Sequence, residues 1–180
     1  MPHPQLVFLY GDLRDTSFTL PLCRALAELG GVLYYGEGCA ALYGAPGAAG
    51  PRFFLLETDR LRSCGAEDAL VICKEGAAFP DNLSHPGRLY ILANTSAPGG
   101  TTDCTAAGGD KIWLGCGCGE GSALALSSLR EDSAVVELRR AIPLPGGGAA
   151  EPTEIPMRLD APTEGWPLLC ACGVRVLFGG

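Results

Sequence analysis

The segment of the chain with the most unusual chemistry is a run in which glycine occupies every second position. It reads GCGCGEG and covers residues 115–121. In an extended strand successive side chains point to opposite faces, so the two sulfurs would share one face, and the glycines would let a metal, a ligand or another backbone approach closely. Thiolates are zinc ligands and redox nucleophiles. If the chain binds a metal, we therefore expect Cys116 and Cys118 to bind it.

A second pair, Cys170 and Cys172, could complete a four-cysteine zinc site, but its surroundings argue against this. The pair lies in the apolar run WPLLCACGVRVLF, which is typical of a protein core. Structural zinc sites usually place their cysteines two to four residues apart on a turn. We therefore expect no metal and no cofactor. We expect Cys116 and Cys118 to react readily with thiol reagents, and Cys170 and Cys172 to react only after unfolding.

The first turn of the chain has the layout of a phosphate-binding loop without its motif. A short apolar run is followed by Gly11 and then by a helical pattern, and P-loop proteins hold phosphate at such a helix N-terminus. Aligned on Gly11, the positions of the second glycine, the lysine and the Ser or Thr hold Thr16, Ser17 and Phe18. Over residues 5–35 the chain resembles MinD- and ParA-like ATPases in outline. That resemblance implies a degenerate nucleotide-binding domain as one alternative.

Two loops are the expected rims of a ligand pocket, because ligands of open α/β sheets collect beyond the carboxyl ends of the strands. One is the turn at residues 11–17. The other, at residues 94–104, is dense in hydroxyl groups and glycines. The candidate ligand-binding residues are Gly11, Asp12, Arg14, Thr16, Ser17, Thr95, Ser96, Gly100 and Thr101.

At most one histidine, His85, supports a hydrolytic function. His85 lies in the segment PDNLSHPG, whose residue types are explained by turn formation. A triad of His85 with Asp81 or Asp110 and a Ser or Cys nucleophile stays open, although residue types alone carry little specificity. The sequence identifies no catalytic residue and leans against an enzyme.

The charge and cysteine content narrow the classes of partner. The 180 residues include 13 Lys and Arg against 20 Asp and Glu, a net charge of −7, which disfavours nucleic acid and anionic lipid as partners. No apolar run is long enough to span a bilayer, and the start of the chain lacks the basic region of a signal peptide. Nine cysteines is an odd number that argues against a disulfide framework. We expect a soluble, cytoplasmic protein.

The first half of the chain predicts strands around one clear helix. Apolar residues repeat at helical spacing from Pro21 to Leu29 and stop at Gly30, with Thr16 or Ser17 expected to supply the N-cap oxygen. Runs with little polar alternation favour parallel strands that are covered on both faces. These strands are expected at Gln5 to Tyr10, Val32 to Tyr35, Arg52 to Leu56, Ala69 to Cys73 and Leu89 to Ala93.

From about residue 99 the chain is richer in glycine, and we expect its strands to pair mostly antiparallel. Residues 123–138 could also be helical, because a short apolar run does not show whether its apolar residues repeat with the period of a helix or of a strand. Gly44 to Gly50 and Pro143 to Glu151 are expected to be loops, the second the tip of a hairpin. The strands are expected at Lys111 to Leu114, Ala123 to Leu129, Ala134 to Leu138, Glu154 to Leu159 and Leu168 to Phe178.

The fold class that follows is α/β with a mixed sheet. It combines a Rossmann-like parallel part around one helix with a C-terminal half of mainly antiparallel strands. We expect one compact domain, 1–180, in which an α/β part (1–98) is followed by a β-rich part (99–180). The leading functional hypothesis is a binding or regulatory module without its own catalysis, whose partner is an unidentified small molecule or protein. The alternatives are a cysteine-based metal or redox protein and the degenerate nucleotide-binding domain.

Overall fold

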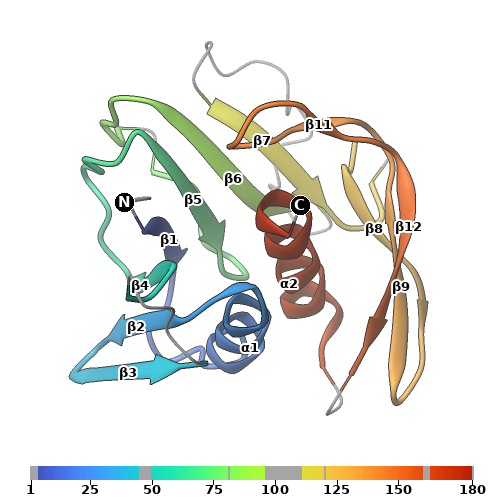
Figure 1. Cartoon of the computed structure of the whole chain (residues 1–180), viewed down its shortest axis with the longest axis horizontal. Coiled ribbons are helices and arrows are strands. Elements are labelled where there is room, and N and C mark those ends of the chain that lie inside the picture. Colours follow the sequence, from blue (N-terminus) through green and yellow to red (C-terminus); the bar gives the residue numbers. More distant parts are fainter. Residues whose placement is uncertain are drawn as a thin grey trace.

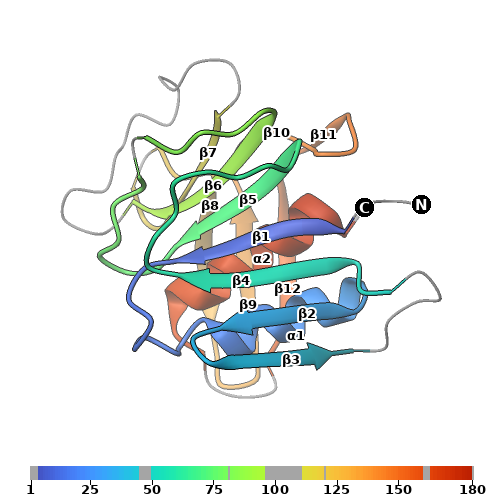
Figure 2. The ribbon, with the colours of Figure 1, turned by 90° about the vertical axis from the view of Figure 1, so that its left-hand side faces the viewer.

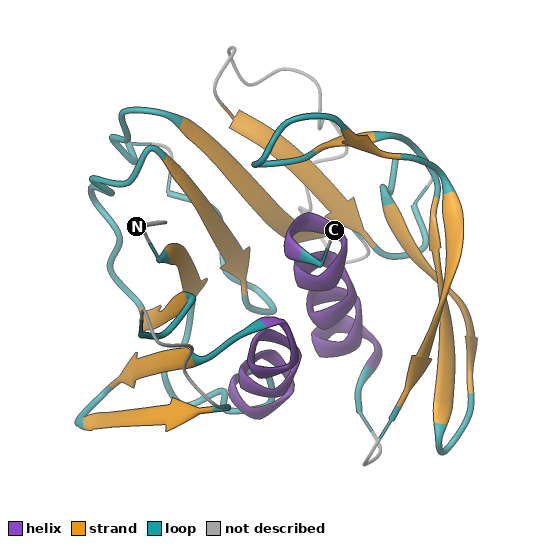
Figure 3. Cartoon of the chain, in the orientation of Figure 1, coloured by secondary structure: helices purple, strands orange, loops and turns teal. Residues whose placement is uncertain are grey.

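The computed structural model describes residues 4–44, 50–80, 82–95, 111–119, 121–159 and 163–179. Two helices and a strongly curved sheet make up most of it, and both helices lie inside the curve of the sheet (Figures 1 and 3). The elements are β1 (Gln5–Tyr10), α1 (Thr19–Leu29), β2 (Val32–Gly36), β3 (Cys39–Tyr43), β4 (Phe53–Thr58), β5 (Asp68–Cys73), β6 (Arg88–Asn94), β7 (Lys111–Cys116), β8 (Leu124–Leu129), β9 (Ser133–Leu138), β10 (Ile142–Pro143), β11 (Ala149–Ala150), β12 (Thr153–Arg158) and α2 (Gly165–Phe178).

The main sheet has ten strands in the order β12-β9-β8-β7-β6-β5-β1-β4-β2-β3 (Figure 2). Strands β2, β4, β1, β5, β6 and β7 pair in parallel, and β8 joins β7 in parallel through one residue pair. Strand β3 is antiparallel at one edge, and β8, β9 and β12 are antiparallel at the other. The predicted mixed α/β fold is confirmed, except that β7 extends the parallel part into the second half of the chain.

The two faces of the sheet are covered differently. Both helices pack on one face and enclose the larger core, to which β1 contributes Val7 and Leu9. The opposite face is covered by the connections at 59–67 and 74–87, which bring Leu61 and Leu83 against Phe8 in a smaller core. Because central strands are buried on both faces, they read as continuous apolar runs in the sequence. This is why β1, β5 and β6 were predictable.

Helix α1 confirms the predicted helix and extends it by two residues, to Thr19. Its buried residues, Leu22, Cys23, Ala25 and Leu26, form one face, as the helical spacing indicates. The predicted N-cap is wrong. The cap position is Phe18, no side chain caps the helix, and the Ser17 hydroxyl donates instead to Asp15. Phe18 is buried against Trp166 of α2, so packing outweighs capping at this end.

The prediction of a strand from Leu168 to Phe178 is wrong, because these residues lie in helix α2. This helix is buried nearly all round, because the sheet covers one side and α1 another. An apolar run without a polar face shows neither a helical nor a strand period, so its sequence could not settle the structure. At Gly173 a Cβ atom would lie 2.9 Å from Leu92 Cδ2, which fits a close approach of helix to sheet.

Two hairpins and one edge strand differ in how well the sequence indicates them. Residues 123–138 form the hairpin β8–β9, not a helix. Strand β3 was not predicted, and its residues are mostly exposed. The hairpin tip expected at Pro143 to Glu151 is confirmed by β10 and β11, whereas residues 45–49 of the loop Gly44 to Gly50 lie outside the described residues. Among the described residues, no helix has the length and apolar character needed to cross a membrane.

Candidate functional site

The loop between β1 and α1, residues 11–18, lies at the carboxyl end of the parallel strands. Strand β1 lies between β4 and β5, and the chain leaves it toward β2 on one side before returning to β5 on the other. Ligands of open α/β sheets bind where the strand order reverses in this way. The loop is therefore where a phosphate would be expected.

A buried lysine fills this loop from inside. Lys74 comes directly after β5, and its side chain is 0% exposed. Its ammonium donates to the backbone carbonyl oxygens of Asp12, at 2.6 Å, and Asp15, at 2.5 Å. It also forms an ion pair with the carboxylate of Glu57 on β4, whose side chain is 4% exposed. An ammonium has three donors, and here all three have acceptors within the protein.

The second oxygen of the Glu57 carboxylate is also occupied. The Tyr34 hydroxyl on β2 donates to it, and the Thr19 hydroxyl on α1 donates to it at 3.2 Å. Burial and this hydrogen bond raise the pKa of Tyr34. Burial, with a smaller effect of the Glu57 charge, raises the pKa of the neighbouring Cys23 thiol to about 12. The Lys74–Glu57 pair thus ties the loop to β2, β4, β5 and α1.

Three backbone N–H groups of the loop, those of Arg14, Asp15 and Ser17, donate to acceptors within the loop. Arg14 N–H donates to the Asp12 carboxylate at 2.9 Å, and Ser17 N–H donates to the Asp15 carboxylate at 3.1 Å. A phosphate cradle has the opposite polarity, with N–H groups that point at the ligand and a cation that neutralises it. In this loop the carbonyl oxygens of Asp12 and Asp15 face inward toward a cation, and the carboxylates of the same two residues accept from two of the N–H groups.

Gly11 has a packing reason for being glycine. Its φ is +146°, and a Cβ atom there would lie 2.7 Å from Lys74 Cβ and 3.2 Å from Ala77 Cβ. A shallow pocket beside Gly11 is lined by the acidic residues Asp12, Asp59 and Glu75. The glycine therefore accommodates Lys74, and the surface next to it is acidic.

Five of the candidate ligand-binding residues lie on the loop after β1, and one lies directly after β6. Asp12, Arg14, Thr16 and Ser17 are exposed on the loop after β1. Thr95 lies at the end of β6, which β5 separates from β1. Its hydroxyl contacts the Ser122 hydroxyl at 2.7 Å and the Cys116 carbonyl oxygen at 3.0 Å. The remaining candidates, Ser96, Gly100 and Thr101, lie outside the described residues.

The two cysteines of the glycine-rich run do not share an exposed face. Strand β7 ends at Cys116, which is fully buried, and the chain turns at Gly117, so that only Cys118 is exposed. The expected accessibility of Cys116 is wrong, because the extended run does not continue past it. Cys170 and Cys172 are buried as expected, and burial raises the pKa of Cys172 to about 12. The described residues contain no group of three or more metal-ligating side chains.

His85 lies half-buried in the connection between β5 and β6. The two carboxylates considered as its partners, Asp81 and Asp110, lie outside the described residues. The structure thus adds no member to a catalytic triad.

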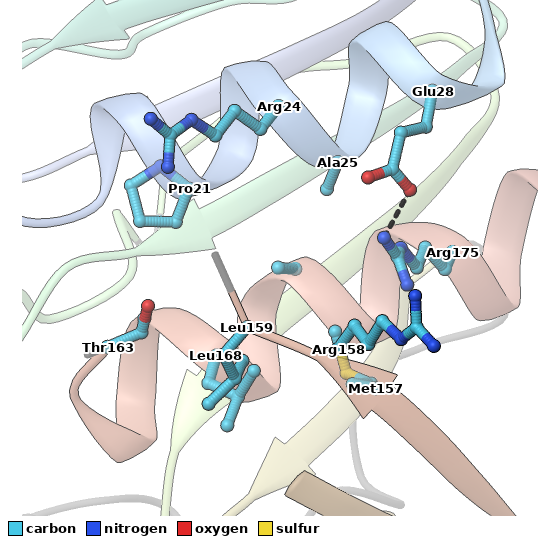
Figure 4. Close-up of a pocket in the computed structure, with 11 residues that line it drawn as sticks. Pro21, Arg24, Ala25, Glu28, Met157, Arg158, Leu159, Thr163, Leu168 and Arg175 are labelled. Carbon is cyan, nitrogen blue, oxygen red and sulfur yellow. Dashed lines mark hydrogen bonds and ion pairs between the residues drawn. The ribbon is translucent and has the colours of Figure 1, made fainter. Parts of the chain in front are cut away.

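Sequence reasoning missed a second site, a pocket between α1, α2 and β12 that three arginines line (Figure 4). These are Arg24, Arg158 and Arg175, one from each element. The only signal in the sequence is a charged residue, Arg175, inside an otherwise apolar run. No local pattern in the sequence indicates that Arg158 lies near Arg175.

Comparisons with known proteins bear on the fold. No protein-family model and no curated protein matches the sequence. A solved structure does match, that of MurF ligase from Thermotoga maritima in complex with ADP, with a TM-score of 0.58 and 14% sequence identity. The fold is similar to that of a Mur ligase domain. The match covers 98% of this chain and 46% of the MurF chain, so the chain spans less than half of that protein.

Proposed function

We propose that the chain is a binding module on a Mur-ligase-like fold and that the loop after β1 holds no nucleotide phosphate. One observation carries the proposal, the Lys74 ammonium inside the loop with carbonyl oxygens of Asp12 and Asp15 turned toward it. To receive a phosphate, the loop would have to turn the carbonyl oxygens of Asp12 and Asp15 away from Lys74 and break the contacts that hold the loop over it. The Lys74 charge is already neutralised by Glu57, so it adds little attraction for a phosphate.

The charges around the loop support the same proposal. Asp12, Asp59 and Glu75 line the pocket beside Gly11, with Arg14 and Arg60 as exposed cations that already pair with Asp12 and Asp59. A nucleotide phosphate carries negative charge, and like charges at short range repel. The MurF structure is that of a complex with ADP, and ADP binding is a property of that protein.

We further propose a cytoplasmic protein whose partner is a small molecule or another protein. Buried thiols such as Cys23, Cys73, Cys170 and Cys172, placed in the core as small apolar side chains, support a reducing compartment. The acidic charge of −7 supports a partner other than nucleic acid.

The test is the melting temperature of the purified protein with millimolar MgADP and MgATP. Ligand stabilisation follows RT ln(1 + [L]/Kd), so a loop without affinity leaves the melting temperature unchanged. The variants are Arg14→Ala in the loop and Arg130→Ala, a matched control at an exposed arginine beyond β8. A shift of several degrees that Arg14→Ala abolishes and Arg130→Ala retains would overturn the proposal.

A further inference from the structure

The pocket between α1, α2 and β12 concentrates positive charge in an acidic protein. It is lined by Arg24, Arg158 and Arg175 against a single carboxylate, that of Glu28. Three positive charges against one leave a local surplus of two, whereas the whole chain carries a net charge of −7. A local field opposite to that of the molecule attracts an anionic ligand to this place.

Much of the hydrogen-bonding capacity of the three arginines is unused. Arg175 pairs with Glu28, but its Nε is buried and has no acceptor in the described part of the chain. Arg24 and Arg158 form no ion pair with any described residue, and both are exposed. Each guanidinium presents five donors in a planar fork that matches a carboxylate or a phosphate group. The guanidinium groups that line the pocket therefore have N–H donors available for the oxygen atoms of a ligand.

The arrangement of the pocket fits a ligand with one charged end. Figure 4 shows the guanidinium groups of Arg158 and Arg175 toward the Glu28 end, with Arg24 nearer Pro21. Apolar side chains such as Leu168 and Ala171 from α2 line the same pocket. Its volume of about 70 Å³ accommodates a group of several heavy atoms, since one water needs only about 10–15 Å³ by the same measure.

We propose that this pocket binds a small organic anion in which a carboxylate or phosphate group is joined to a compact apolar part. The inference rests on the proposed role as a binding module and gives that role a site and a ligand chemistry. The oxyanion binds to Arg158 at the Glu28 end of the pocket, where Glu28 holds Arg175 in place beside it, and Arg24 adds positive charge from the Pro21 end. The apolar part lies against Leu168 and Ala171.

The test uses isothermal titration with four probes: phenyl phosphate, benzoate, inorganic phosphate and benzyl alcohol. We expect phenyl phosphate or benzoate to bind in the millimolar range or tighter, and benzyl alcohol, which has no charge, not to bind. Tighter binding of phenyl phosphate than of benzoate assigns the site to phosphate esters, and the reverse order assigns it to carboxylates. Equal binding of benzyl alcohol, or no binding of any probe, would overturn the inference.

The double variant Arg24→Gln/Arg158→Gln locates the binding. Each charge-assisted hydrogen bond to an oxyanion contributes substantially to the binding free energy. We therefore expect the double variant to weaken binding by about tenfold or more. The matched control, Arg14→Gln/Arg130→Gln, removes two exposed arginines elsewhere and should leave binding unchanged. If both variants bind as the wild type does, the pocket is not the site. The nucleotide test depends on Arg14 and not on Arg24 or Arg158, so the two proposals can fail separately.

Discussion

Two cationic centres border helix α1, and they differ in what their charges contact. Lys74 is 0% exposed and has acceptors for all three donors, one of them the carboxylate of Glu57. Arg24 and Arg158 are exposed and pair with no described residue. The charge has the same sign in both places, but the protein neutralises it completely at Lys74 and only at Arg175 in the pocket, through Glu28. A cation whose partners are all internal holds the fold together, whereas a cation with free donors can bind something else.

The contrast follows from the physics of buried charge. Removing an ammonium from water is expensive, and the interior compensates only when every donor is satisfied. A guanidinium at the surface keeps its hydration until a ligand replaces it. Substitutions at the two centres should therefore affect different properties: stability at Lys74, and ligand affinity at the arginines.

The largest effect is expected for Lys74→Met. The variant leaves the Glu57 carboxylate buried without its cation, which should lower the free energy of unfolding by about 3–5 kcal/mol. Urea unfolding measures this. The matched control is Arg60→Met, whose exposed pair with Asp59 spans 3.9 Å and should cost less than about 1 kcal/mol. The double variant Lys74→Met/Glu57→Gln should recover part of the loss, and simple additivity would contradict the coupling.

A smaller loss is expected for Gly11→Ala. The added Cβ would lie 2.7 Å from Lys74 Cβ at a φ that L residues rarely adopt, which should cost about 1–3 kcal/mol. Gly146→Ala is the control, because a Cβ there meets nothing within 4 Å. Thermal unfolding of the two variants side by side is the measurement. Equal melting temperatures would show that Lys74 does not lie against the loop as described.

The pH dependence of stability should report on the buried Cys23 thiol of α1. Burial raises the pKa of Cys23 from 9.0 to about 12, so the folded state keeps a proton that the unfolded state loses above pH 9.0. Its contribution is complete below that pH and is lost as the pH rises toward 12, by about 1.4 kcal/mol per pH unit. Cys23→Ala should flatten the slope by that amount in reducing denaturant titrations. Cys39→Ala, at an exposed position, is the control.

The smallest effect on stability is expected at the arginine pocket. Arg24→Gln/Arg158→Gln removes two exposed charges without described partners, so the free energy of unfolding should change by less than about 0.5 kcal/mol. Urea unfolding in the absence of ligand tests this. A loss above about 2 kcal/mol would mean that these arginines are structural, as Lys74 is, and the contrast between the two centres would disappear.

The sequence predicted elements whose patterns are local and missed contacts that are distant. Helix α1 was predictable because its buried residues repeat along one face and Gly30 follows it. Helix α2 was not, because neighbours on several sides make its whole surface apolar. Its buried cysteines were still placed correctly in the core, since burial depends on composition and not on the period.

Both cationic centres depend on contacts that no local pattern encodes. Lys74 follows the apolar strand β5 and reads as an ordinary lysine at the end of a strand until the loop after β1 folds over it. In the pocket, Arg175 pairs with Glu28, which is 147 residues away in the sequence. The phosphate-binding motif is missing from the first loop, which is visible in the sequence. No sequence pattern indicates that Lys74, which follows β5, occupies that place.

Amide chemical-shift mapping locates ligand binding at both cationic centres in one protein sample. MgADP and then phenyl phosphate are titrated into isotope-labelled protein, and the shifted amides are assigned. We expect residues 11–18 to keep their shifts with either ligand, and phenyl phosphate to move amides around Arg24, Arg158 and Arg175. Saturable shifts of Gly11 to Ser17 with MgADP, together with an unmoved arginine pocket, would contradict both expectations.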